Sequence, residues 1–265
     1  MHISYLDQYL PGRSWVHQLD ARVKFLAVAA FVLACALTPA GAWGGFAMLG
    51  GIWGLTVALA GIRYSVLLRR GLVALPFALA AVTLLFTRPG DTLVMLPVGR
   101  WTVRITAEGV TAFLSVMLKS WLSVLMALLL TATTSYPDLL RALSGIGLPR
   151  VLVAIIGFMY RYLFVLADEA QRLLRAREAR SARPAGRRGG GSIAWRARVA
   201  GGMVGNLFMR SYERSERIYQ AMVSRGYAGE IRTLSSPRLS WRDVASLGVF
   251  LGLLLAVQIA TRWVR

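Results

Sequence analysis

Long apolar runs separated by short polar segments dominate the chain. Five of these runs predict membrane-spanning helices: Val23–Thr38, Gly41–Ile62, Leu72–Phe86, Thr111–Thr133 and Val244–Thr261. A spanning helix needs about 20 residues, so the shorter runs must extend into their flanks. The pattern therefore predicts an all-α polytopic membrane protein with about five transmembrane helices.

A sixth apolar run, Val151–Ala167, contains Arg161 and continues without a break into charged sequence. Arginine and lysine collect in cytoplasmic loops, and the basic residues beside the first, second and fourth spans place the N-terminus and the even-numbered loops in the cytoplasm. If the sixth run crossed the bilayer, the basic segment Asp168–Asp243 would lie outside. We therefore expect this run not to span, and to form one end of a long helix under the bilayer or against the other spans.

This topology divides the chain into three parts. We expect an N-terminal membrane domain of about four spans at residues 1–133, a cytoplasmic region at 134–243 and a C-terminal transmembrane helix at 244–265. Leu93–Thr106 has Pro-Val-Gly between β-branched residues, which favours a short extracytoplasmic hairpin. Proline, glycine and arginine crowd together in Arg183–Ser192, which favours a break between helices.

The charge of the chain has two explanations. The formal net charge is +19, although only 16% of the residues are charged, against about a quarter in a typical soluble domain. Asp168–Asp243 contains 16 arginines and seven acidic residues. A membrane-anchored nucleic-acid binder is one alternative, but the interspersed acidic residues and the scarcity of lysine argue against it. We expect arginines placed by the membrane topology, and no nucleic acid.

The end of the cytoplasmic region predicts an amphipathic helix. At 100° per residue, one stripe holds Arg210, Arg214, Arg217, Ala221 and Arg225, while the opposite side holds Phe208, Tyr212, Tyr219, Met222 and Val223. Gly226 suits the left-handed position that ends a helix, so Arg225 is expected at a helix C-terminus. Taken alone, an arginine there is explained by the helix dipole.

The preceding predicted helix, Leu166–Ser181, also ends on an arginine between small residues. This repetition favours a docking role for both helix ends. A planar guanidinium flanked by small side chains can reach a carboxylate or backbone carbonyls of a partner through two parallel hydrogen bonds.

These segments resemble the transmembrane T component of energy-coupling factor (ECF) transporters, the EcfT/CbiQ family. They are most similar to the CbiQ branch, which is associated with cobalt uptake. The resemblance rests on PGRSWVHQLDARVKFLA (Pro11–Ala27) before the first span and on two cytoplasmic segments, Arg161–Ser181 and Asn206–Glu230. It covers nearly the whole chain and implies a non-catalytic scaffold of a bacterial or archaeal cell membrane, with long cytoplasmic coupling helices.

The resemblance also implies partners and contact residues. The partners would be two ABC ATPase subunits, a substrate-binding S component (CbiM-like or vitamin-specific) and the lipid bilayer. In the family, two Ala-Arg-Gly-like motifs end the coupling helices and dock into grooves on the ATPases. The matching residues here are Ala179, Arg180 and Ser181, and Ser224, Arg225 and Gly226. Serine at positions 181 and 224 departs from the pattern, but its small side chain keeps the arginine accessible.

The implied cargo is cobalt or nickel, with two alternatives. One is a T component that serves vitamin-specific S components, and the other is a self-contained membrane channel or carrier. Lys119, inside the fourth span, would matter most for a channel. Its structural alternative is a hydrogen bond to a neighbouring span or a side chain that reaches outward, and we favour that alternative.

No catalytic, cofactor or metal site is expected. Gly189–Ser192 lacks the Gly-Lys-Ser/Thr ending of a phosphate-binding loop, so ATP hydrolysis must come from another chain. The two histidines, His2 and His17, and the single Cys35 do not assemble a recognisable metal or nucleophile motif. The chain is therefore not expected to be an enzyme.

Small residues recur every four positions in the second span, at Gly50, Gly54 and Ala58. Small residues at this spacing let helices approach closely. They are expected either to pack against another helix of the same chain or to form a smooth contact surface for the S component.

Overall fold

The computed structural model describes residues 9–72, 80–87, 89, 91–98, 101–180, 192–229 and 239–263. These residues form helices, the turns and loops between them and one two-stranded hairpin, and the predicted helical membrane fold is confirmed. Contacts divide the chain into two compact units. We call Ser4–Ile146 with Pro237–Arg265 the larger unit, and the unit built on Gly147–Ser236 the two-helix unit. The three-part division expected from the sequence stays a prediction.

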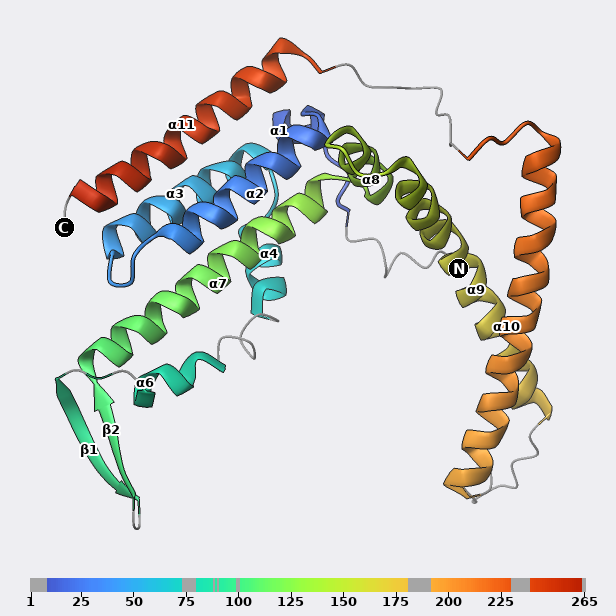
Figure 1. The fold of residues 1–265 in the computed structure, drawn as a ribbon, viewed down its shortest axis with the longest axis horizontal. Coiled ribbons are helices and arrows are strands. Elements are labelled where there is room, and N and C mark those ends of the chain that lie inside the picture. The colour runs from blue at the N-terminus through green and yellow to red at the C-terminus, as the bar shows by residue number, and fades with distance from the viewer. Residues whose placement is uncertain are drawn as a thin grey trace. The chain divides into compact units, whose positions relative to one another are not determined.

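Long helices form the body of the larger unit (Figure 1). They are α2 (Ala21–Leu37), α3 (Trp43–Ala60), α7 (Ala107–Thr133) and α11 (Trp241–Trp263). Both α2 and α3 pack against α7 and α11. Helices α3, α7 and α11 are long and apolar enough to cross a membrane, and the 17 residues of α2 coincide with the first predicted span. Four of the five predicted spans therefore correspond to one continuous helix each.

The core of the larger unit lies where these helices meet. Phe31 and Cys35 of α2 and Leu49 of α3 are almost fully buried, and they join one cluster with residues of α7 and α11. Lipid tails are as apolar as leucine, so close packing and hydrogen bonds hold such helices together. Gly45 of α3 illustrates the close packing, because a Cβ atom there would collide with the methyl group of Thr261 in α11.

Shorter elements connect the long helices. They are α1 (Trp15–Gln18), α4 (Tyr64–Gly71), the 3₁₀ turn η2 (Ala80–Thr83), α6 (Leu84–Thr87) and α8 (Tyr136–Gly145). The predicted span Leu72–Phe86 falls between α4 and α6, and residues 73–79 lie outside the described part. In what is described, this run contains η2 and most of α6, and α4 ends before it, where Gly71 packs against Trp121 and Leu125 of α7.

A β-hairpin precedes α7. Strands β1 (Thr92–Val98) and β2 (Trp101–Thr106) are antiparallel, with Val98 opposite Trp101 and a register shift between Thr92 and Val94. The hairpin expected at Leu93–Thr106 is therefore confirmed, and its extracytoplasmic location stays a prediction. Thr106 both ends β2 and caps α7, since its hydroxyl accepts a hydrogen bond from the Gly109 backbone N–H.

The C-terminal end of α2 is held by side chains of its two neighbours. Nζ of Lys119 in α7 donates to the Ala36 carbonyl at 3.1 Å. Nε2 of Gln258 in α11 donates to the Ala34 carbonyl at 2.6 Å and to Oγ1 of Thr38 at 3.1 Å. The last carbonyls of a helix lack partners within it, and Lys119 supplies a donor to one of them, that of Ala36. The Ala34 carbonyl also accepts the backbone N–H and the hydroxyl of Thr38, so Gln258 adds a further donor there and links α11 to this end of α2. Lys119 thus makes the helix-to-helix hydrogen bond that we favoured from the sequence.

Candidate functional site

Two long helices carry both of the predicted docking motifs. In the two-helix unit, α9 (Arg150–Arg180) has 31 residues and α10 (Ile193–Ser224) has 32, so each is about 46–48 Å long. The apolar run Val151–Ala167 and the charged sequence after it form one uninterrupted helix, as expected. Helix α9 is also apolar and long enough to cross a membrane. That property does not test whether the run spans, and its non-spanning position stays a prediction.

The second docking motif ends α10 in a well-defined cap. Gly226 has φ +82°, which is the left-handed conformation that glycine adopts without strain. Its N–H donates to the Val223 carbonyl at 2.9 Å, and the Tyr227 N–H donates to the Met222 carbonyl at 3.0 Å. These two bonds make a Schellman cap. They place Arg225 at the last position before the turn, with its side chain exposed.

The first docking motif lies at the end of α9. Ala179 and Arg180 are the last residues of the helix, and both are exposed. Ser181 lies outside the described residues. The helix break expected at Arg183–Ser192 also lies outside them, except for Ser192. Ser192 caps the next helix, since its hydroxyl accepts a hydrogen bond from the Trp195 N–H at 3.3 Å. Each of the two helices therefore presents an exposed arginine at its C-terminal end.

An ion pair between their side chains joins the two helices. Glu169 of α9 accepts hydrogen bonds from Arg172 at 2.6 Å and from Arg210 of α10 at 3.1 Å. Its side chain is only 15% exposed, whereas both arginines are mostly exposed. The hydrogen bond from Arg172, followed by the interaction with Arg210, holds the pKa of Glu169 below its ordinary value. Arg210, one of the predicted arginine stripe, thus tethers α10 to α9.

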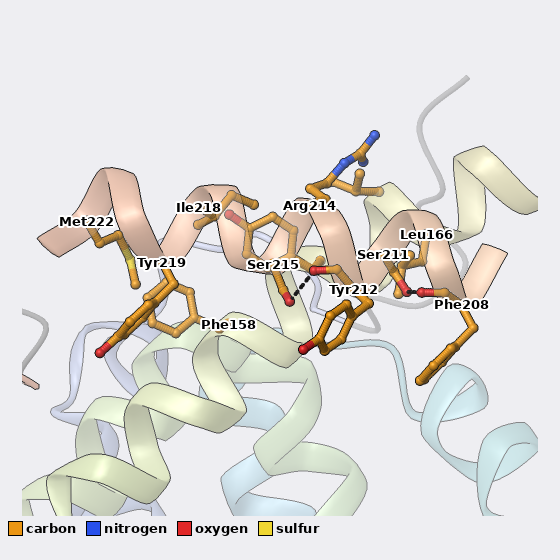
Figure 2. Close-up of a pocket in the computed structure, with 12 residues that line it drawn as sticks. Phe158, Leu166, Phe208, Ser211, Tyr212, Arg214, Ser215, Ile218, Tyr219 and Met222 are labelled. Carbon is orange, nitrogen blue, oxygen red and sulfur yellow. Dashed lines mark hydrogen bonds between the residues drawn. The ribbon is translucent and has the colours of Figure 1, made fainter. Parts of the chain in front are cut away.

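Between α9 and α10 lies an apolar groove of about 460 Å³. Its walls are Phe158, Tyr162, Val165 and Leu166 of α9 and Phe208, Ser211, Tyr212, Arg214, Ser215, Ile218, Tyr219 and Met222 of α10. Figure 2 shows the rings of Tyr212 and Tyr219 on the side of α10 that faces α9, while Arg214 extends away. Phe208, Tyr212 and Tyr219 are each more than half exposed, so the groove is open.

The sequence indicated only one side of this groove. The apolar stripe predicted for α10 is confirmed at Phe208, Tyr212, Tyr219 and Met222, whereas Val223 does not line the groove. The side chains of α9 were missed. Phe158, Tyr162 and Leu166 follow one another at intervals of four residues on one helix face, and that spacing could have identified them.

The small-residue stripe of α3 faces away from the core. Gly45, Phe46, Leu49, Trp53, Val57 and Ala60 form the buried side of this helix. A Cβ atom at Gly50 or Gly54 would meet nothing within 4 Å, and Ala58 is exposed. The Gly54 carbonyl accepts the Tyr64 hydroxyl of α4 at 2.7 Å, whereas the space beside Gly50 and Gly54 and the Ala58 side chain are open in the described part of the chain.

No metal-binding cluster occurs in the described part of the chain. Groups of three or more His, Cys, Asp or Glu side chains that could hold an ion are absent there. His17 is engaged locally, with Nδ1 at 2.6 Å from the Ser14 hydroxyl and Nε2 at 3.1 Å from the Leu10 carbonyl. His2 lies outside the described residues.

A helical membrane body and two long basic helices with exposed arginines at their C-terminal ends define a polytopic membrane subunit. The family described as cobalt transport protein, CbiQ, matches residues 12–235. The chain belongs to this EcfT/CbiQ family of transmembrane T components of ECF transporters. It is accordingly a multi-pass membrane protein and a non-catalytic subunit of a transporter.

Similar proteins come from bacteria and archaea. The energy-coupling factor transporter transmembrane protein EcfT of Listeria innocua is 30% identical over 268 residues, which cover 94% of this chain and 96% of that protein. The EcfT protein of Acidaminococcus fermentans is 29% identical, with 97% and 96% covered. An uncharacterized protein of Methanocaldococcus jannaschii is 30% identical over 67% of this chain, and the match spans 56% of its own length.

Proposed function

We propose that this chain is the scaffold of an ECF importer and couples two ABC ATPase subunits to one substrate-binding S component in the lipid bilayer. The supporting observation is the pair of exposed arginines, Arg180 and Arg225, at the C-terminal ends of two helices that are tied to each other. The Schellman cap at Gly226 fixes the position of Arg225 and leaves its guanidinium free of the helix body. Such a group can enter a groove of another protein and form two hydrogen bonds there.

The two-helix unit supplies a physical path for this coupling. ATP binding would close the ATPase pair and draw the two arginine tips with it. The Glu169–Arg210 ion pair and the packing around it join α9 to α10. Movement of the C-terminal end of one helix would therefore also move the other helix. The open apolar groove beside this pair is suited to an apolar helix of the S component, which would be reoriented when the walls of the groove move. The small-residue stripe at Gly50, Gly54 and Ala58 would offer a second, smooth contact to the same subunit.

Charge reversal at the arginine tips tests this function. The chain would be co-expressed with the ATPase and S-component subunits of its own genome. Arg180→Glu and Arg225→Glu should each abolish co-purification of the ATPases and substrate uptake, while the chain is still recovered from the membrane fraction. Arg198→Glu is the matched control, because it reverses an exposed charge near the opposite end of α10. If both tip variants retain ATPases and uptake at the control level, the docking assignment is wrong.

Cobalt or nickel is the proposed cargo. The match to the cobalt transport family supports it, whereas the similar EcfT proteins carry no cargo in their names. Uptake of radioactive Co²⁺ or Ni²⁺ by the co-expressed complex tests the proposal. Uptake of a labelled vitamin in place of the metals would instead favour a T component for vitamin-specific S components. Transport by this chain alone in liposomes would favour the self-contained channel or carrier.

A further inference from the structure

The two-helix unit is an insertion between two helices of the larger unit. The chain leaves the larger unit after Ile146, at the end of α8, and returns at Pro237, just before α11. Any force that the two-helix unit exerts along the chain must pass through these two connections. The contacts that hold the neighbouring ends of α7, α8 and α11 therefore determine whether that force moves these helices together or separately.

Lys24 holds the end of α7. Its side chain is only 8% exposed, and its Nζ donates to the Thr133 carbonyl at 3.2 Å and to the His17 carbonyl at 3.0 Å. The adjacent Ala132 carbonyl accepts the Leu10 N–H at 3.0 Å. The last carbonyls of α7 have no partners within the helix. The residues that satisfy them come from the start of α2 and the segment before it.

Asp243 holds the start of α11. It is 9% exposed, and its Oδ2 accepts the Ser240 N–H at 3.0 Å while its Oδ1 accepts the Asp20 N–H at 3.3 Å. Asp20 in turn caps α2, because its Oδ1 accepts the Arg22 N–H at 2.8 Å. A bond between residues 223 positions apart in sequence thus joins the starts of α2 and α11.

The end of α8 is packed against the same turn of α2. The guanidinium of Arg22 lies so close to Gly145 that a Cβ atom at that position would collide with it. The first turn of α2 therefore contacts the end of α7, the end of α8 and the start of α11. Both connections to the two-helix unit begin from this one place.

We propose that Asp20, Lys24 and Asp243 form a coupling anchor, a set of positioning residues that makes the larger unit receive the movement of the two-helix unit as one body. This inference rests on the proposed function. Each contact of Lys24 and Asp243 involves a charged group that is largely buried, and such hydrogen bonds are stronger than neutral ones. Without them the ends of α7 and α11 can shift separately, and ATP-driven movement is absorbed in the larger unit without reorienting the S component.

The test compares Lys24→Met with Lys119→Met in the complete complex, reconstituted in lipid vesicles with its ATPase and S-component subunits. Both variants replace a lysine of a membrane helix by an unbranched apolar side chain. Lys119 serves as the control because its hydrogen bond to the Ala36 carbonyl holds the opposite end of α2. We expect Lys24→Met to retain ATP hydrolysis and to lower uptake per ATP hydrolysed about tenfold, equivalent to about 1.4 kcal/mol of coupling. Lys119→Met should leave that ratio unchanged.

Equal ratios for wild type and Lys24→Met would overturn the coupling anchor, as would an equal fall in both lysine variants. If Lys24→Met is not recovered from membranes, Asp243→Asn decides by the same ratio, since it keeps the size of the side chain and removes one acceptor and the charge. If neither Lys24→Met nor Asp243→Asn is recovered while Lys119→Met is recovered normally, Lys24 and Asp243 serve folding alone, and this result would also overturn the proposal. Failure of the proposed function would be detected separately, because the wild-type chain would then not co-purify with the ATPases.

Discussion

Replacing Gly226 by alanine should loosen the tip of α10 and leave the rest of the helix intact. The reason is the backbone conformation, because Gly226 has φ +82°. Nothing lies within 4 Å of the position a Cβ atom would take, so no steric collision contributes. The cost is then that of placing an L-residue in the left-handed region, about 1–2 kcal/mol. This free energy opposes the two capping bonds and not the helix as a whole.

Hydrogen exchange of backbone amides measures the loosening. The amides of Arg225, Gly226 and Tyr227 donate to carbonyls of the last helical turn, and a cost of 1–2 kcal/mol should speed their exchange by a factor of about 5–30. Asparagine adopts the left-handed conformation more readily than alanine, so Gly226→Asn should have a smaller effect. Gly205→Ala is the opposite control. It lies inside α10 with open space around it, and alanine should strengthen the helix there by about 0.8–1 kcal/mol.

ATPase binding should follow the same order as amide exchange. If Arg225 acts through its fixed position at the tip, co-purification of the ATPases should weaken from wild type to Gly226→Asn to Gly226→Ala. Unchanged exchange at 225–227 in Gly226→Ala would refute the capping argument. Faster exchange at the tip with undiminished ATPase binding would refute the role of the cap in presenting Arg225, while leaving the arginine itself as a contact.

Further outcomes are expected in both units. The pKa of Glu169 is lowered in the folded protein, so its ion pairs stabilise the α9–α10 contact at pH values above the ordinary pKa of 4.5. This stabilisation is lost as the pH falls below 4.5 and the carboxylate is protonated. Spin-label distances between α9 and α10 should therefore widen on acidification, and Glu169→Gln should remove the pH dependence. Gly45→Ala should lower thermal stability by about 1–3 kcal/mol, because the added methyl group meets α11. Gly44→Ala, with open space around it, should not. Gln258→Leu should cost about 0.5–1.5 kcal/mol in thermal unfolding, the range of an ordinary hydrogen bond, because the Ala34 carbonyl keeps the Thr38 backbone N–H and hydroxyl as donors.

Local sequence patterns were enough to predict the long helices and the cap of α10. Four apolar runs each became one helix, and the Arg-Gly step at 225–226 ended α10 as expected, because a glycine in this context has a strong conformational preference. The run at Leu72–Phe86 shows the limit of composition. Its apolar residues predict a spanning helix, but its described part contains η2 and most of α6, and α4 ends before it.

Contacts between distant segments were beyond prediction from one sequence. The groove needs both α9 and α10, and the face of α9 that takes part is defined only when α10 lies beside it. The bond between Asp20 and Asp243 joins residues that no local pattern relates. An aspartate before a helix predicts a cap, but it does not reveal that the capping residue also donates its N–H to another helix.

The two chain crossings after Ile146 and before Pro237 start from neighbouring places on one body. Because the two ends of the intervening segment meet the larger unit at one place, that segment can change in length or sequence while its two junctions keep their positions. Under the proposed function, related chains could therefore differ in the two-helix unit, and in the ATPases that it contacts, while the helices of the larger unit stay the same.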